Sequence, residues 1–189
     1  MGRLLLALLV LAFCAPAASI REVDFNNFSY PFVSHKYFSV PSRLRWMPMA
    51  AGGRVALHDG RYTLPCDDPS CYLLTFEQVT FGKITGVGEV AIATVVFHTG
   101  GTANWEYMYV VAIRAGKPQV AAWAEAGSRA DMGLRRVSTD HGDLLLEVND
   151  PGKREGDCCS TGSITFRYRW QQGAFRQIDK PVRADDPPR

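Results

Sequence analysis

Apolar and polar residues alternate in short runs along most of the chain beyond residue 18, and turn residues separate these runs. Residues 164–170 (Ile-Thr-Phe-Arg-Tyr-Arg-Trp) place apolar or aromatic side chains at every second position, which is the period of a half-buried strand. Residues 90–97 are instead almost continuously apolar, as expected of a central strand covered on both faces. By the same patterns, further strands are predicted at residues 54–58, 61–64, 72–81, 105–113, 119–124, 144–148 and 174–178.

Turn residues between the predicted strands favour antiparallel hairpins. Asp59-Gly60 readily adopts the positive φ values of a two-residue turn, and residues 140–143 have the composition of another turn. No later stretch keeps the apolar spacing of a helix between two capping signals. We therefore predict a mainly β fold with few or no helices: a single antiparallel β-sandwich or partly open barrel over residues 19–179.

The first eighteen residues have the three parts of a secretory signal peptide. Arg3 supplies a positive charge, residues 4–13 are uniformly apolar, and a small-residue stretch follows, with predicted cleavage after Ala17 or Ala18. The apolar run holds about 10 residues, half of the roughly 20 that a membrane-spanning helix needs. We therefore expect an exported chain, either periplasmic or secreted.

Two further features bear on the compartment and on the ends of the chain. The stretch before Cys14 resembles a bacterial lipobox, but the bulky Phe13 stands where a small residue is needed, which disfavours a lipid anchor. No later segment is long and apolar enough to span a membrane. Residues 180–189 contain three prolines and two adjacent aspartates and are predicted to be a disordered tail.

The charge balance argues against a nucleic-acid partner. The formal net charge of the whole chain is +2, and removing Arg3 with the signal peptide leaves 2 − 1 = +1. Nucleic-acid binders carry a far more basic balance. The predicted partner is instead an envelope protein or a glycan, since the chain is expected to be exported. Two strand faces are aromatic at every second position and would suit glycan or peptide stacking if exposed: Trp105, Tyr107 and Tyr109, and Phe166, Tyr168 and Trp170.

Cysteine usage fits an oxidising compartment. Of the five cysteines, one leaves with the signal peptide, and the even number that remains predicts disulfides: Cys66, Cys71, Cys158 and Cys159. Each pair could close within its own loop, or the two loops could be tied together, and both arrangements stay open. Adjacent Cys158 and Cys159 are poorly spaced to chelate zinc, so neither a metal nor another cofactor is predicted.

Residues 81–91 (Phe-Gly-Lys-Ile-Thr-Gly-Val-Gly-Glu-Val-Ala) resemble the loop of FG-GAP or VCBS-type repeats. In those families a strand enters a Gly-Asp-x-Thr-Gly-Asp-Gly turn whose aspartates ligate calcium. Lys83 and Val87 stand here in place of the two aspartates, so the resemblance implies a β-hairpin with a glycine turn and argues against calcium. Residues 127–134, 157–159 and 166–170 together resemble a group of exported bacterial proteins of unknown function, which implies a compartment and no activity.

No local catalytic motif stands out in the chain. The segment around Ser128 lacks the G-x-S-x-G elbow and the helix that follows it, and the four histidines are scattered. If the chain were a secreted hydrolase, its acid or base would be drawn from four residues: Glu89, Glu106, Asp131 and His98.

The preferred hypothesis is a non-enzymatic, disulfide-stabilised domain that binds a partner or ligand in the cell envelope. Two polar, glycine-containing loops beside the second cysteine pair, residues 127–136 and 150–161, are the predicted contact surface. The candidate binding residues in these loops are Arg129, Asp131, Arg135 and Asp157.

Overall fold

The computed structural model describes residues 19–33, 44–64, 73–98, 104–128, 132–155 and 159–187. Its sheets are antiparallel and do not close into a barrel, which confirms the predicted mainly β fold. Helical structure in the described residues is limited to two 3₁₀ turns, η1 (Ile20–Glu22) and η2 (Phe25–Asn27). None of the described helices is long and apolar enough to cross a membrane.

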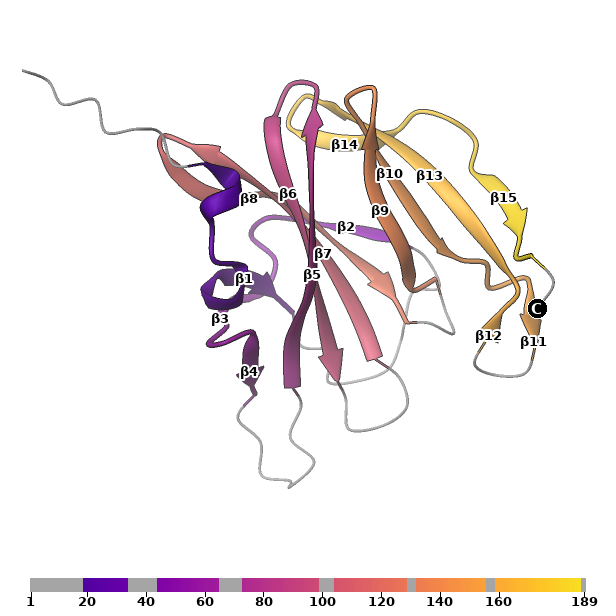
Figure 1. Cartoon of the computed structure of the whole chain (residues 1–189), viewed down its shortest axis with the longest axis horizontal. Helices are drawn as coiled ribbons and strands as arrows, with labels where there is room; N and C mark the ends of the chain where they lie inside the picture. Colours follow the sequence, from indigo (N-terminus) through magenta and orange to yellow (C-terminus); the bar gives the residue numbers. More distant parts are fainter. Residues whose placement is uncertain are drawn as a thin grey trace, which may run out of the picture.

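A six-stranded sheet, here called the large sheet, forms the centre of the molecule (Figure 1). Its spatial order is β2 (Arg45–Met47), β8 (Lys117–Gly127), β7 (Asn104–Arg114), β6 (Gly88–His98), β5 (Leu73–Ile84) and β4 (Arg61–Thr63). Every residue of β6 from 90 to 97 is buried, as its continuous apolar run predicts. The large sheet is therefore covered on both faces.

The strands that follow β8 form a second, smaller sheet in the C-terminal half, here called the small sheet. Its order is β14 (Ala174–Gln177), β13 (Gly162–Gln171), β10 (Asp143–Asn149) and β9 (Leu134–Asp140). The alternation predicted for residues 164–170 is present, because Ile164 and Tyr168 are buried while Arg169 is exposed. One face of this sheet therefore points into the molecule and the other carries polar residues.

The C-terminal segment corrects the sequence analysis. Disorder was expected from residue 180, yet β15 (Val182–Asp185) pairs antiparallel with β13. Acidic and basic side chains secure it: Arg183 pairs with Asp150, Lys153 with Asp185, and Arg135 with Asp186. Pairing and charge together offset the ordering entropy that composition alone suggested would dominate.

The N-terminal segment packs on the opposite face of the large sheet. The short pair β1 (Ser29–Phe32) and β3 (Gly53–Ala56) lies there (Figure 1), and a second short pair, β11 (Arg154–Glu155) and β12 (Cys159–Ser160), lies in the C-terminal half. Tyr30 and Phe32 pack against Tyr107 and Tyr109 of β7 in one hydrophobic core. The architecture thus has three layers, with the large sheet in the middle.

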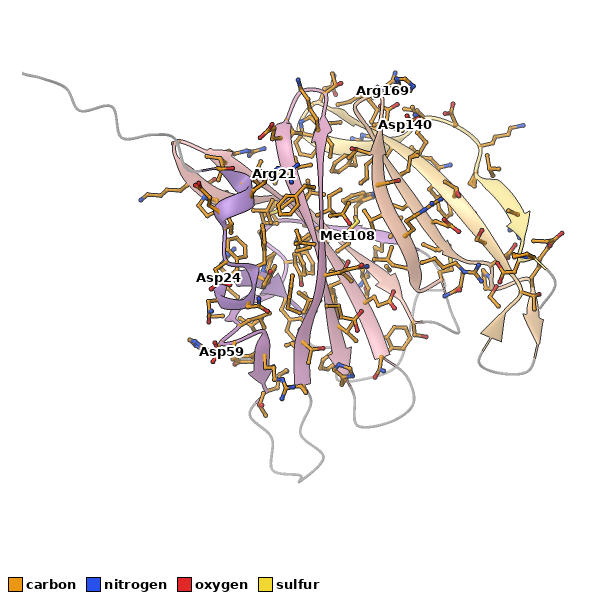
Figure 2. All side chains as sticks on the ribbon, viewed as in Figure 1. Arg21, Asp24, Asp59, Met108, Asp140 and Arg169 are labelled. Carbon is orange, nitrogen blue, oxygen red and sulfur yellow. The ribbon has the colours of Figure 1, made fainter. Side chains whose placement is uncertain are left out.

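Alternate residues of β7 enter two different cores. Tyr109 faces the N-terminal layer, whereas Met108, near the middle of the molecule in Figure 2, packs with Leu144 and Leu146 of the small sheet. This follows from the period of two along a strand. Because β7 is covered on both faces, its sequence is apolar along most of its length, and its polar residues are confined to the ends.

Two turns predicted from the sequence are present in the structure, and they differ in how far the flanking strands pair. Gly86 (φ +83) turns the chain between β5 and β6, which confirms the hairpin expected at residues 81–91. At Asp59-Gly60 the tight turn is also present, with φ of 50° and 78°. The strands beside it separate, however, because β3 pairs with β1 and β4 pairs with β5. His58 and Arg61 form one antiparallel bridge beside the turn, so the predicted hairpin is present at its turn and first residue pair but does not extend into β3 and β4.

Candidate functional site

A hollow of about 490 Å³ opens on the inward face of the small sheet, and we call it the β13 hollow. Three alternate residues of β13 form its floor, which places their side chains on one face of the strand: Ile164, Phe166 and Tyr168. Figure 1 shows β15, which pairs with β13, at the outer margin of the small sheet. The remaining lining residues are Leu44, Met132, Pro151, Gln177, Pro181 and Arg183.

The lining combines an apolar surface with a few polar groups. Three of the described lining residues carry polar side-chain groups, namely Tyr168, Gln177 and Arg183, and the other six are apolar. Burial raises the pKa of Tyr168 to about 12, against a smaller lowering effect of the Trp46 side chain, so the hydroxyl stays neutral at physiological pH. The volume of the hollow falls within the range of small-ligand sites, about 300–1,000 Å³.

Ion pairs hold the rim of the β13 hollow in place. Arg183 donates to the carboxylate of Asp150, whose side chain is 0 % exposed and also accepts from the Gly152 amide at 2.8 Å. A buried carboxylate requires such partners, because an unpaired charge in the interior lowers the free energy of unfolding by on the order of several kcal/mol. The guanidinium of Arg183 is itself 59 % exposed at the rim.

Arg135, predicted to contact a partner, is instead tied into the fold. Its guanidinium donates to both carboxylate oxygens of Asp186, to the Asn149 side chain at 2.7 Å and to the Ser160 carbonyl at 3.2 Å. The hydrogen bond to Asp186 raises the pKa of Arg135 further above its ordinary value, so it stays charged. Arg135 thus joins the start of β9 to the segment after β15.

The other three candidate binding residues, Arg129, Asp131 and Asp157, lie outside the described residues. The two predicted contact loops nevertheless contribute to the hollow, because Met132 belongs to one and Pro151 to the other. Sequence reasoning missed both residues, since it searched these loops for charged and polar side chains. The weak signal is the alternating aromatic face of residues 164–170, which is usually core in a strand but suits glycan or peptide stacking where it is exposed.

Glu106 is the candidate acid with the most unusual environment. It lies half-buried on β7, and its carboxylate accepts a hydrogen bond from the Leu134 amide at the start of β9. Burial raises the pKa of Glu106 to about 7; the Leu134 amide opposes this and the charge of Glu77 adds to it. Glu106 therefore bridges the two sheets through one hydrogen bond.

Neither of the two other hydrolase candidates that the structure describes, Glu89 and His98, joins Glu106 in an acid–base pair. His98 is engaged on both ring nitrogens, with Thr75 Oγ1 at 2.8 Å and Asn104 Oδ1 at 3.1 Å. Glu89 is exposed near the opposite end of β6 from His98, and Asp131 lies outside the described residues. Within the described part of the chain, no hydrogen bond joins any two of the four candidates.

Two further charged features have a structural explanation. Asp143, only 3 % exposed, accepts from Arg169 at 2.8 and 2.9 Å and from Arg167 at 3.3 Å, and Arg167 also donates to Asp140. Figure 2 shows Asp140 and Arg169 together at one end of the small sheet.

A smaller hollow of about 260 Å³, between η1 and the β5–β6 hairpin, is lined in part by Arg21, whose guanidinium lies over the Phe81 ring at 4.7 Å.

The predicted disulfides stay predictions. Cys66, Cys71 and Cys158 lie outside the described residues, and Cys159 begins the short strand β12. Among the described side chains, no group of three or more His, Cys, Asp or Glu residues is placed to hold a metal ion.

No protein-family model matches the chain, and no curated protein or solved structure matches it. The resemblance of residues 81–91 to FG-GAP and VCBS-type loops therefore stays a prediction. So does the wider resemblance to exported bacterial proteins. The chemistry of the site has to be argued from the residues of this chain.

Proposed function

We propose that the chain is an exported, non-enzymatic domain that binds an apolar group of a partner or ligand in the cell envelope through the β13 hollow. The observation that carries this proposal is the hollow itself, about 490 Å³ in volume, in which six of the nine described lining residues are apolar. Apolar groups gain free energy on leaving water, at roughly 25 cal/mol per Å² of buried surface. The few polar groups at its edge would orient what binds.

Binding accounts for the site better than catalysis does. General acid–base catalysis needs a proton donor or acceptor within hydrogen-bond reach of the reacting group, usually held by a second side chain. The described residues that line the β13 hollow include no carboxylate, histidine or cysteine. The charged side chain at its rim, Arg183, is engaged with Asp150. The lining of the β13 hollow is therefore better suited to binding a partner or ligand than to acid–base catalysis.

The export part of the proposal has local support at Ser19. The Ser19 amide donates to a carboxylate oxygen of Glu22 at 3.1 Å, and the next residue, Ile20, is buried. Cleavage after Ala18 would turn this amide into a positively charged amino terminus beside the same carboxylate. An amino terminus at Ser19 would therefore gain a favourable ion pair and leave the core intact.

Titration with the apolar fluorophore 1-anilinonaphthalene-8-sulfonate tests the binding site. We expect saturable binding to the folded chain, weakened at least about tenfold by Phe166→Glu, because a tenfold change needs only about 1.4 kcal/mol and a carboxylate in an apolar lining costs more. Met49→Glu is the matched control, since Met49 is an exposed apolar residue outside the lining. It should bind as the unsubstituted chain does.

Circular dichroism and the thermal midpoint establish that each variant is folded. If Phe166→Glu fails to fold, Gln177→Trp narrows the hollow from an exposed rim position and should also weaken binding. Dye binding that neither hollow variant reduces, or that Met49→Glu reduces equally, would place the site elsewhere. An absence of saturable binding to the unsubstituted chain would overturn the proposal.

A further inference from the structure

The outer edge of β15 borders the β13 hollow. β15 pairs with β13 along one side, and no strand in the described part of the chain pairs with its other side. All four of its residues are exposed, and Figure 1 shows β15 at the outer margin of the molecule. Strand edges of this kind offer backbone donors and acceptors to another chain.

The hydrogen-bond pattern tells which backbone groups point outward. The Asp186 amide donates to the Thr161 carbonyl at 2.8 Å, so these two residues form a hydrogen-bonded pair of the antiparallel ladder. Such pairs alternate with non-bonded ones, which places Arg183 and Asp185 opposite Ile164 and Gly162 in non-bonded pairs. The amide and carbonyl groups of Arg183 and Asp185 therefore face away from β13, towards the open edge.

A second contact agrees with this assignment. The Asp150 amide donates to the Gly162 carbonyl at 3.0 Å, so Gly162 directs its backbone towards the β10 side of β13. It cannot direct the same carbonyl towards Asp185. Two independent hydrogen bonds thus agree that four backbone groups, two donors and two acceptors, lie along the free edge of β15.

The same edge continues the lining of the hollow. Arg183 stands opposite Ile164 in the register, and both line the β13 hollow. A residue added opposite Arg183 in a new strand would have its side chain on this face, because directly opposed residues share a face of a sheet. Backbone pairing and an apolar side chain could therefore be recognised together, as in known cases of strand addition.

We infer that the occupant of the β13 hollow is an extended polypeptide segment that pairs with the free edge of β15 and directs an apolar side chain towards the hollow. This inference rests on the proposed function, since it names the kind of partner for the same site. The partner has an unpaired backbone over at least four residues and apolar residues at alternate positions. The outward amide and carbonyl groups of Arg183 and Asp185 hold its backbone.

A phage-displayed library of random linear heptapeptides, selected against the full chain, supplies the probe. We expect selected sequences to carry apolar residues at every second position. A synthetic selected peptide should bind about tenfold more weakly when alternate amides are N-methylated in one phase, and nearly unchanged in the other phase. This dependence on phase distinguishes strand pairing from simple apolar binding.

A pair of variants at one position tests the edge directly. Asp185→Pro removes an outward-facing amide and should weaken peptide binding at least about tenfold. Asp185→Asn is the matched control, because it also removes the charge that pairs with Lys153 but keeps the amide. It should bind the peptide as the unsubstituted chain does. Dye binding in the hollow should persist in both variants, while circular dichroism and the thermal midpoint establish that they are folded.

Three results would overturn the inference. The first is that no peptide is enriched while the dye still binds, which leaves the proposed binding site in place. If neither peptide nor dye binds, the proposed function is overturned as well. Another is peptide binding that tolerates N-methylation in both phases or survives Asp185→Pro. The last is self-association of the chain in light scattering that Asp185→Pro abolishes, which would make a second copy the occupant.

Discussion

Two carboxylates on the inner and outer faces of the sandwich show how neighbours decide the behaviour of a residue. Glu106 is half-buried and accepts one hydrogen bond from the Leu134 amide, so burial dominates and its pKa rises to about 7. Asp143 is only 3 % exposed, yet the hydrogen bonds from Arg169 and Arg167 hold its pKa below the ordinary value. Burial without a positive partner raises the pKa of a carboxyl, and burial beside two arginines lowers it.

Glu106 should make stability depend on pH near neutrality. Its pKa is about 7 in the folded chain against an ordinary value of 4.5, so the folded state binds more protons between these pH values. The free energy of unfolding therefore falls as pH rises through that window, by at most about 3 kcal/mol. Glu106→Gln stays neutral and should remove this decline, which urea unfolding at pH 5, 6, 7 and 8 would measure.

The control for Glu106 lies on the neighbouring strand. Glu89 is exposed on β6, so Glu89→Gln should leave the pH dependence of the unsubstituted chain in place. An unchanged slope between pH 5 and 7 in Glu106→Gln would show that the carboxyl is ionised throughout this range in the folded chain.

At the scale of elements, equivalent turns differ in what they touch. Ala115-Gly116 and His141-Gly142 have nearly the same backbone, with φ values of 49° and 73° in the first and 48° and 82° in the second. Both match the two-residue hairpin turn. Only the second meets the other sheet, because the Thr85 amide donates to the Gly142 carbonyl at 2.9 Å. The hairpins of the two sheets are joined at this point.

Alanine at these two glycines should separate backbone strain from contact. A Cβ at Gly142 would lie 2.1 Å from Thr85 Oγ1, whereas a Cβ at Gly116 would have nothing within 4 Å. Gly116→Ala should therefore lower the free energy of unfolding by only about 1 kcal/mol, because alanine is strained at the positive φ of this position. Gly142→Ala should cost at least about 1 kcal/mol more in free energy of unfolding, because the hairpins must move apart. Equal losses in the free energy of unfolding for the two variants, measured in urea, would mean that the Thr85 side chain moves aside without an energetic penalty.

Local pattern explains why the elements were predictable and their partners were not. The strands of the long hairpins follow from alternation and turn residues within about ten positions of each other. The separation of β3 from β4 depends on a contact further away, because the Leu57 amide donates to the Phe28 carbonyl at 3.1 Å and the Leu57 side chain is buried. Nothing between residues 54 and 64 indicates that contact.

At the scale of the whole molecule, both faces of the large sheet are covered by segments distant in sequence. The N-terminal layer packs on Tyr109, and the small sheet packs on Met108, the preceding residue of β7. The first described residues already take part, since Ile20 is buried in the same core as Tyr109. A mature chain that begins at Ser19 would keep both cores intact.

Intact mass of the exported chain tests processing and oxidation together. We expect a mass that corresponds to cleavage after Ala18, since the amino terminus at Ser19 would lie beside Glu22. Of the five cysteines, the four beyond Cys14 should react with iodoacetamide only after reduction. The denatured, unreduced chain is the control, because burial alone can no longer protect a thiol there. A lipid on Cys14, or thiols that react without reduction, would contradict export as a soluble, disulfide-bonded domain.

The sequence by itself determined the mainly β class, the continuously apolar central strand and the glycine turns, because each depends on residues within one element or one turn. Only the tertiary structure decided that residues 182–185 form a strand and that the alternating face of β13 partly lines a hollow. Both depend on contacts between residues far apart in the chain, such as Arg135 with Asp186 and Arg183 with Asp150. An apolar side chain has the same local pattern in a core and in a binding site, and only its surroundings distinguish the two.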